Sequence, residues 1–362
     1  MRREIISSKQ GVTLLILFIF GSTFVVGTGG EAKKDMWLAV IIAIIGALPM
    51  YFIYAKLLMS FPEKDLYDIV ELVFGKLLGK AIILLYIFYS LHLGGLVVYN
   101  FNEFIGTVGL EQTPMIIPSS IIMVLCIWML KQGIEGLARW GELFLPILIT
   151  IVFLAAMFSI PNMDINNILP IAANGIKPIA KGALDTFSFP LTETVLFTVA
   201  FSSLKNSKAA FKIYILALII AGGTLVMSLL INILVLGEYI ISINYYPTFV
   251  AVARINIGNF LQRLESAVLI TFLIAGFVKI CICILAASKG IAKVLNFKDY
   301  RFIVIPQALM ILNFSFIVTK DAMDLRIWNQ QIYSYYASIF EVILPLIIFI
   351  CAKLRYKKLK KL

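Results

Sequence analysis

The chain alternates long apolar segments with short polar connections over almost its whole length. A transmembrane helix needs about 17–25 predominantly apolar residues. Ten segments of this kind can be drawn, at roughly 11–30, 37–60, 80–108, 115–131, 139–159, 182–203, 210–238, 265–288, 301–319 and 336–354. The pattern therefore predicts an all-α membrane protein with ten transmembrane helices.

Lys and Arg are distributed unevenly between alternate connections. With the N-terminus in the cytoplasm, 22 of the 31 fall in inner connections and tails, 8 fall in outer ones, and Lys279 lies within a span. Cytoplasmic loops carry such an excess, so we expect an even number of spans and two cytoplasmic termini. Arg2 and Arg3 precede an apolar run as in a signal peptide. No convincing small-x-small cleavage site follows, so we expect a retained first span.

Composition supports one integral membrane domain over residues 1–362. The chain is 61% hydrophobic, with a mean hydropathy of +0.98, far above a soluble domain. The net charge of +11 sits on inner loop ends and the tail, which favours contact with membrane lipid and gives no reason to expect nucleic acid. One His and four Cys, all four within spans, argue against zinc sites and His-based triads. We expect no enzyme activity, catalytic residue, metal or cofactor.

Two polar connections have helical amphipathic patterns. Residues 61–79 place apolar side chains at helical spacing, with acids and lysines on the other face. Residues 245–264 show a similar pattern on the outer side. Both are expected to be helices at the membrane interface.

The ten spans divide into two sets of five, 11–159 and 182–354. Because five is an odd number, the second set enters the membrane from the opposite side and has inverted topology. In transporters of this plan, the site forms where the first helix of each set is broken. The first span carries Gly21-Ser22-Thr23, and the sixth carries Pro190 within residues 187–193. Proline breaks or kinks a helix and glycine permits it. The alternative is that these residues only aid helix packing.

Ionisable residues inside hydrocarbon are costly, so each is a candidate for function. Lys279 in span 8 either holds that span against the unwound part of span 1, taking the place of a coupling ion, or extends its ammonium towards the inner headgroups. Glu193, beside the predicted break in span 6, either receives a substrate ammonium or a proton, or bonds freed backbone N–H groups.

Span 3 carries two further candidates. Tyr99, Asn100 and Glu103 lie in its outer half, and Tyr99 and Glu103 share a face that would line a vestibule; a position at the membrane edge needs no function. His92 is interpreted as an interhelical hydrogen-bonding residue rather than a proton relay.

Broken helices can bind an amino acid. Their exposed backbone N–H groups suit its carboxylate, and their free carbonyl oxygens, with a nearby acidic side chain, suit its ammonium. The predicted ligand-binding residues are Gly21, Ser22, Thr23, Tyr99, Asn100, Glu103, Phe187, Ser188, Phe189, Thr192 and Glu193. Lys279 is the predicted ion- or proton-coupling residue.

Several segments together resemble the bacterial spore germination permease family, a branch of the amino acid–polyamine–organocation superfamily. The similarity covers the full length, and its order and spacing are more specific than any single motif. The segments are ISSKQ before span 1, the Gly-Ser-Thr step, residues 35–37, 61–62 and 75–80, Thr113-Pro114, residues 133–139, 246–248 and 263–265, and Phe277-Val278-Lys279. Residues 24–30 depart from the pattern expected of this family in span 1, because they contain more glycine and no proline.

The resemblance implies a B-type subunit of a nutrient germinant receptor in the spore inner membrane. Such a subunit binds a small germinant, an amino acid for example, and works with an A-type membrane subunit and a C-type lipoprotein. Two other functions stay open at this stage: a proton-coupled amino-acid transporter, and a scaffold that only positions its partners.

Overall fold

The helices of the computed structural model follow the predicted spans closely. The structure describes residues 4–109, 112–255 and 265–359. In chain order its α-helices are α1 Ser8–Phe20, α2 Thr23–Val26, α3 Met36–Ser60, α4 Leu66–Val108, α5 Ile116–Gln132, α6 Ile134–Ser159, α7 Ile176–Thr186, α8 Phe197–Ala200, α9 Ala210–Ile243, α10 Pro247–Ala253, α11 Glu265–Leu295, α12 Val304–Ile317, α13 Ala322–Trp328, α14 Ser334–Ser338 and α15 Leu344–Leu359.

Short turns of tighter or wider helix connect several of these elements. The 3₁₀ turns are Gly30–Asp35, Ile160–Asn162, Ile165–Ile168, Thr192–Leu196, Phe201–Ser203, Ser207–Ala209 and Tyr300–Phe302. Three π-helical turns, Phe187–Leu191, Asn329–Tyr333 and Ile339–Ile343, lie within spans 6 and 10. Turns of this kind inside a span mark places where the regular hydrogen-bond ladder is disturbed.

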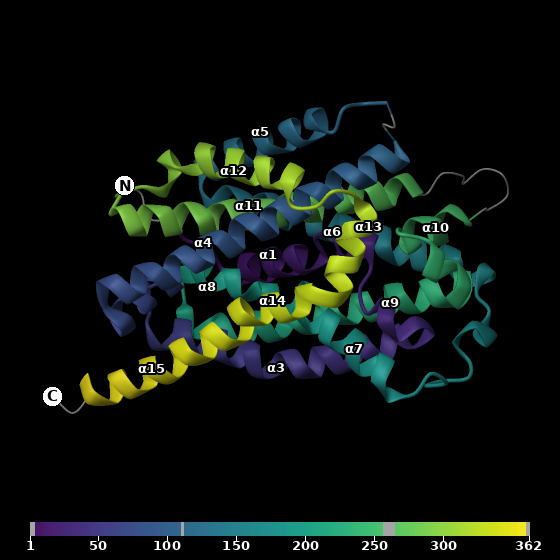
Figure 1. Ribbon diagram of the computed structural model, residues 1–362, viewed down its shortest axis with the longest axis horizontal. Coiled ribbons are helices and arrows are strands. Elements are labelled where there is room, and N and C mark those ends of the chain that lie inside the picture. Colours follow the sequence, from purple (N-terminus) through teal and green to yellow (C-terminus); the bar gives the residue numbers. More distant parts are fainter. Residues whose placement is uncertain (1–3, 110–111, 256–264, 360–362) are drawn as a thin grey trace.

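The described helices account for all ten spans. Six are long and apolar enough to cross a membrane, and α1, α5 and α12 are shorter apolar helices. The remaining span is the interrupted segment from α7 to α8. The chain is therefore a multi-pass membrane protein, as its hydropathy predicts. The first and last helices bring both ends of the chain to the same end of the bundle, which an even number of spans requires (Figure 1).

Local sequence signals explain several helix boundaries. The Ser7 hydroxyl accepts a hydrogen bond from the Gln10 N–H, and the Gln10 side chain accepts one from the Ser7 N–H, which begins α1. Asp65 and Asp68 form the same capping pair at the start of α4. Gly133, with a φ of 91°, separates α5 from α6 because glycine tolerates this backbone geometry.

The two helices predicted in the polar connections are both shorter in the structure. Within residues 61–79 the helix begins at Leu66, and a sharp kink at Gly75, where φ is 79° and ψ is 179°, separates this short helix from the span 3 part of α4. Of the predicted helix 245–264, only Pro247–Ala253 is helical among the described residues, and residues 256–264 lie outside them.

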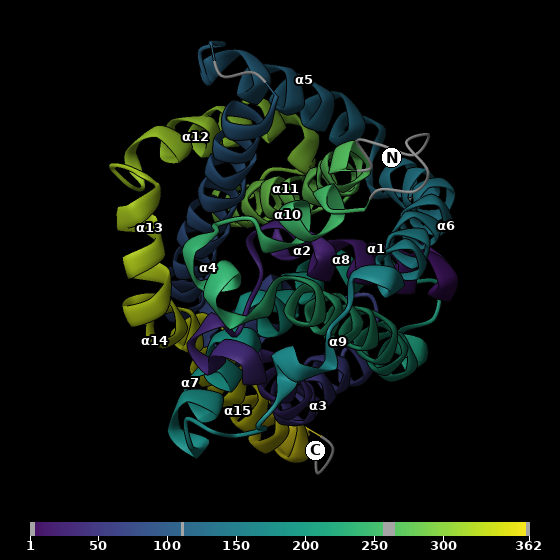
Figure 2. The same ribbon diagram turned by 90° about the vertical axis from the view of Figure 1, so that its right-hand side faces the viewer.

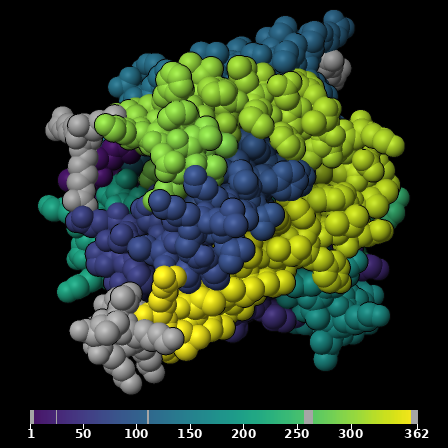
Figure 3. Space-filling model, turned by 60° about the vertical axis from the view of Figure 1, so that its left-hand side comes forward, coloured from purple at the N-terminus to yellow at the C-terminus, as the bar shows by residue number. Residues whose placement is uncertain are grey.

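The broken helices lie at the centre of the bundle. Viewed from the end opposite the two termini, α1, α2 and α8 are surrounded by the other helices (Figure 2). Residues 14–20 of α1 are almost completely buried. On one side, α4 packs between α12 and the C-terminal helices α13–α15 (Figure 3). The interrupted backbone is thus enclosed by protein, which is where irregular backbone is tolerated at membrane depth.

Candidate functional site

Span 1 is interrupted directly after α1. Gly21 has a φ of 20°, and Gly27 and Gly29 have φ values of 76° and 69° beyond the single turn of α2. A side-chain carbon added at Gly21 would collide with the Lys279 side chain and lie 2.8 Å from the Phe18 carbonyl oxygen. Glycine is therefore required at this position both by backbone conformation and by the close approach of α11.

Span 6 is interrupted over residues 187–191. Phe189 has extended backbone angles, with φ −120° and ψ 111°, and Pro190 has no N–H to donate. The Phe189 carbonyl oxygen accepts a hydrogen bond of 2.9 Å from the Thr28 hydroxyl. A side chain of span 1 therefore joins the two interrupted segments.

Lys279 forms an ion pair with Glu193 between α11 and the broken span. The Lys279 Nζ lies 2.5 Å from the Glu193 Oε2, and neither side chain is exposed. The ammonium also lies 5.2 Å from the centre of the Phe18 ring and 4.7 Å from that of Phe189. The sequence left two positions open for this ammonium, one beside the broken spans and one at the inner headgroups. In the structure it lies beside the broken spans.

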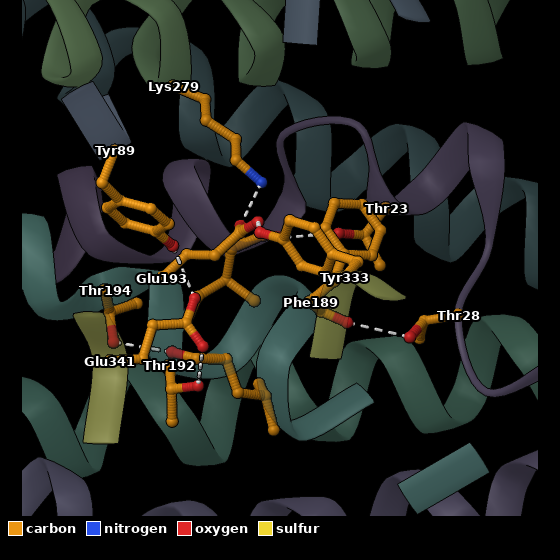
Figure 4. Close-up of polar contacts among 12 residues, drawn as sticks. Thr23, Thr28, Tyr89, Phe189, Thr192, Glu193, Thr194, Lys279, Tyr333 and Glu341 are labelled. Carbon is orange, nitrogen blue, oxygen red and sulfur yellow. Dashed lines mark hydrogen bonds and ion pairs between the residues drawn. The ribbon is translucent and has the colours of Figure 1, made fainter. Parts of the chain in front are cut away.

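Sequence reasoning missed two residues next to this ion pair. The Tyr333 hydroxyl donates to the second carboxylate oxygen of Glu193. Glu341, in span 10, is fully buried; its Oε1 accepts a 2.6 Å hydrogen bond from the Tyr89 hydroxyl, and its Oε2 lies 2.7 Å from the Thr192 hydroxyl. Figure 4 shows these side chains converging from four parts of the chain. An acid inside an apolar segment is the signal that could have identified Glu341.

Two neighbouring cavities lie along the broken helices and share part of their lining. The outer one has a volume of about 160 Å³, and its lining includes residues 26–31, Asp185, Phe189, Arg326, Asn329 and Tyr333. The deeper one has a volume of about 20 Å³, and its lining includes Ser22, Asn100, Phe189, Glu193 and Tyr333. Phe189 and Tyr333, whose ring centres are 6.3 Å apart, border both cavities.

Four predicted ligand-binding residues, Ser22, Asn100, Phe189 and Glu193, line the deeper cavity. The Ser22 hydroxyl and the Asn100 carbonyl oxygen are buried there without a hydrogen-bond partner among the described residues. These unpartnered groups are free to bind water or a polar ligand group in that cavity.

Five other predicted residues shape the breaks without lining either cavity. Gly21 terminates α1, and the Thr23 hydroxyl donates to the Ile19 carbonyl at 2.9 Å. The Thr192 hydroxyl bonds the Phe187 carbonyl at 2.8 Å, and Ser188 bonds the Ser334 carbonyl at 3.4 Å.

Tyr99 and Glu103 line neither cavity. Tyr99 packs beside the deeper one, in a small cluster with Leu96 and Tyr333, which line it. Glu103 is half-buried. The outer cavity instead uses Asp185 and Arg326, which sequence reasoning did not select.

The Nδ1 of His92 does not make the hydrogen bond expected of this residue, because it is buried without a partner among the described residues. The ring packs against Trp328 and Tyr336, with centres 5.3 and 5.1 Å away. The four cysteines are free thiols, as their positions within spans predict.

Comparison with known proteins agrees with this architecture. A full-length relative, spore germination protein KB of Bacillus subtilis (strain 168), is 27% identical over 365 residues, which cover 100% of this chain and 98% of the relative. Two solved transporter structures share the fold. Mhp1, a nucleobase-cation-symport-1 family transporter with bromovinylhydantoin bound, has a TM-score of 0.70 at 10% identity, covering 93% of this chain and 75% of its own. MhsT in complex with L-phenylalanine has a TM-score of 0.64 at 12% identity, covering 96% and 89%.

The structural likeness confirms the predicted fold class: ten transmembrane helices in two inverted sets of five, with the first helix of each set broken. The family model described as spore germination protein matches residues 5–323. The sequence features, the central broken helices and these matches lead to one conclusion: the chain belongs to the spore germination permease family.

Proposed function

We propose that this protein is the germinant-binding B-type subunit of a spore germination receptor. It binds a small amino-acid-like molecule between broken spans 1 and 6 and signals to an A-type membrane subunit and a C-type lipoprotein. It resides in the spore inner membrane with both termini in the cytoplasm. The observation that carries the proposal is the cavity of about 160 Å³ bordered by both breaks.

The size and chemistry of this cavity suit a small zwitterion. An apolar cavity of about 150 Å³ is large enough for benzene, so 160 Å³ holds a small amino acid. Asp185 and Arg326, both in its lining, supply one charge of each sign, for the ammonium and the carboxylate. The L-phenylalanine held by MhsT makes amino acids the first compounds to test.

The deeper cavity supplies the route by which binding is sensed. Its volume of about 20 Å³ is close to that of a single water, so a ligand reaches the predicted residues Ser22, Asn100 and Glu193 only if Phe189 and Tyr333 move apart. Because Tyr333 bonds Glu193, and Glu193 pairs with Lys279, this movement is transmitted to α11. A ligand that binds the open arrangement better shifts the equilibrium towards it.

The test is ligand-induced thermal stabilisation of the purified protein with a panel of amino acids and sugars. A compound at 100 times its Kd stabilises the folded state by about 2.7 kcal/mol. Asp185→Asn and Arg326→Gln are expected to weaken the stabilisation by a hit at least tenfold in apparent affinity. Glu135→Gln, a matched change in the first turn of α6 and outside both cavities, is expected to leave it unchanged. A hit that binds both cavity variants as tightly as the wild type contradicts this site, and no hit in the panel contradicts ligand recognition by this subunit alone.

The buried ion pair supports a second candidate, a proton-coupled amino-acid transporter in which Lys279 or Glu193 carries the coupled charge. Ionisable groups inside a membrane domain mark ion and proton pathways. Uptake of labelled amino acid into proteoliposomes, abolished by Lys279→Ala, supports transport. Binding without uptake in the wild-type protein supports the receptor.

A further inference from the structure

Glu341 is a second acid at the core of the membrane domain, close to the ion pair but outside it. Its side chain is fully buried in span 10, and the described residues provide it with hydroxyl partners, Tyr89 and Thr192. Lys279 lies 2.5 Å from Glu193 and acts on Glu341 only through longer-range attraction. Two buried acids, Glu193 and Glu341, thus lie near one buried cation, Lys279, which pairs directly with Glu193 alone.

The hydrogen bonds around Thr192 require one more hydrogen than Thr192 has. Its Oγ1 lies 2.8 Å from the Phe187 carbonyl oxygen and 2.7 Å from the Glu341 Oε2. A hydroxyl carries one hydrogen and can donate one such bond. A carbonyl oxygen only accepts, so both short contacts are hydrogen bonds only if the hydroxyl donates to Phe187 and Glu341 donates to the hydroxyl.

A hydrogen on the Glu341 Oε2 completes this arrangement without further change. The protonated oxygen donates to Thr192, Thr192 donates to the Phe187 carbonyl, and the other oxygen of Glu341 accepts from Tyr89 at 2.6 Å. Every partner then has the role its chemistry allows.

The surroundings of Glu341 also favour its neutral form. The titratable groups around it are Tyr51 and Tyr54 of α3, Tyr86 and Tyr89 of α4, Glu193 of span 6, Lys279 of α11, and Tyr333 and Tyr336 of span 10. Lys279 is the one cation of this set, and it is paired with Glu193. A second ionised carboxylate here is a buried charge without a close counter-ion, which is strongly unfavourable.

We infer that Glu341 is a proton-binding site, occupied in the conformation described, in which the Glu341 Oε2 holds a proton and donates it in a hydrogen bond to Thr192. When the proton leaves to water, the Thr192 hydroxyl turns from the Phe187 carbonyl to the carboxylate. Phe187 begins the interrupted segment of span 6, so proton occupancy changes the hydrogen bonding of the break itself. The inference stands independently of the identity of any ligand.

Infrared difference spectroscopy of the purified protein at neutral pH tests this directly. The wild-type spectrum minus that of Glu341→Gln is expected to contain the carbonyl band of one protonated carboxylic acid, shifted on exchange into D₂O. The matched control is Glu193→Gln, which removes the neighbouring carboxylate that pairs with Lys279. The wild-type spectrum minus that of this control is expected to contain the bands of an ionised carboxylate. Loss of carboxylate bands in Glu341→Gln, with no acid band lost, overturns the inference.

A second variant keeps the inference testable if Glu341→Gln does not fold. Thr192→Val removes the hydroxyl that accepts from Glu341 and keeps a similar shape. The acid carbonyl band is then expected at the position of a more weakly hydrogen-bonded acid. An unchanged acid band in Thr192→Val shows that the proton lies elsewhere and overturns the assignment.

Discussion

Lys279 and Glu193, 86 positions apart in the chain, form a fully buried ion pair with an N–O distance of 2.5 Å. The pair joins α11 to the interrupted segment of span 6 at the point where span 1 is also broken. The ion pair therefore links α11 directly to the interrupted segment of span 6 through side chains.

Removing one member of the ion pair is expected to be severely destabilising. Lys279→Met leaves Glu193 as a buried charge without its partner, and breaking a buried pair in this way costs about 3–5 kcal/mol. The double variant Lys279→Met, Glu193→Leu is expected to recover much of that loss. Thermal unfolding in detergent micelles measures both. A single variant as stable as the wild type shows that the charges are not coupled.

Gly21→Ala is expected to destabilise the protein by more than about 1 kcal/mol, because the new side chain meets Lys279 and the Phe18 carbonyl and the φ of 20° disfavours it. Gly223→Ala is the matched control, since no atom lies within 4 Å of the added carbon and α9 is regular there. The control is expected to be neutral or more stable by about 0.5–1 kcal/mol. Equal unfolding temperatures of the two variants contradict the close approach at Gly21.

Tyr333→Phe is expected to lower stability by about 1.5–3 kcal/mol, because it removes a hydrogen bond to the charged Glu193. Tyr335→Phe, two positions along and 70% exposed, is expected to change stability little. Comparing the thermal unfolding of the two variants isolates the hydrogen bond from the ring. A loss of equal size in both contradicts the proposed contact.

Stability is expected to fall as the pH rises from about 4 to about 6, through the titration of Asp65. Burial, with the nearby Asp68 carboxylate, raises the pKa of Asp65 from 3.8 to about 6. Between these values the folded state binds more protons than the unfolded state, so the free energy of unfolding decreases with increasing pH. Because Asp65 is only half-buried, solvent reduces the effect to about 1–2 kcal/mol.

Asp65→Asn is the variant that isolates this contribution. Asparagine still caps α4 but does not titrate, so this part of the pH dependence is expected to disappear from the unfolding temperature. The same slope in the variant assigns the titration to another group.

Local pattern determined the ten spans, their alternation and the two breaks. Hydropathy is a property of each segment by itself, and Pro190 and the glycines at positions 21, 27, 29 and 30 permit a break in the helix wherever the helix is placed. Glu193 and Lys279 could be selected for the same reason, because their cost in hydrocarbon does not depend on their partners. Glu341 carries the same signal, although it was not among the predicted residues.

Tertiary packing decided which of these residues meet. Glu341 joins Thr192 across 149 positions, and Tyr333 joins Glu193 across 140, distances over which no periodicity carries information. The rotation of each helix about its axis directs Lys279 towards Glu193, leaves Tyr99 and Glu103 out of the lining of both cavities, and brings Asp185 and Arg326 into the lining of the outer one. That rotation is set by side-chain packing between helices, so the spans follow from the sequence alone, whereas the composition of the site follows from the folded bundle.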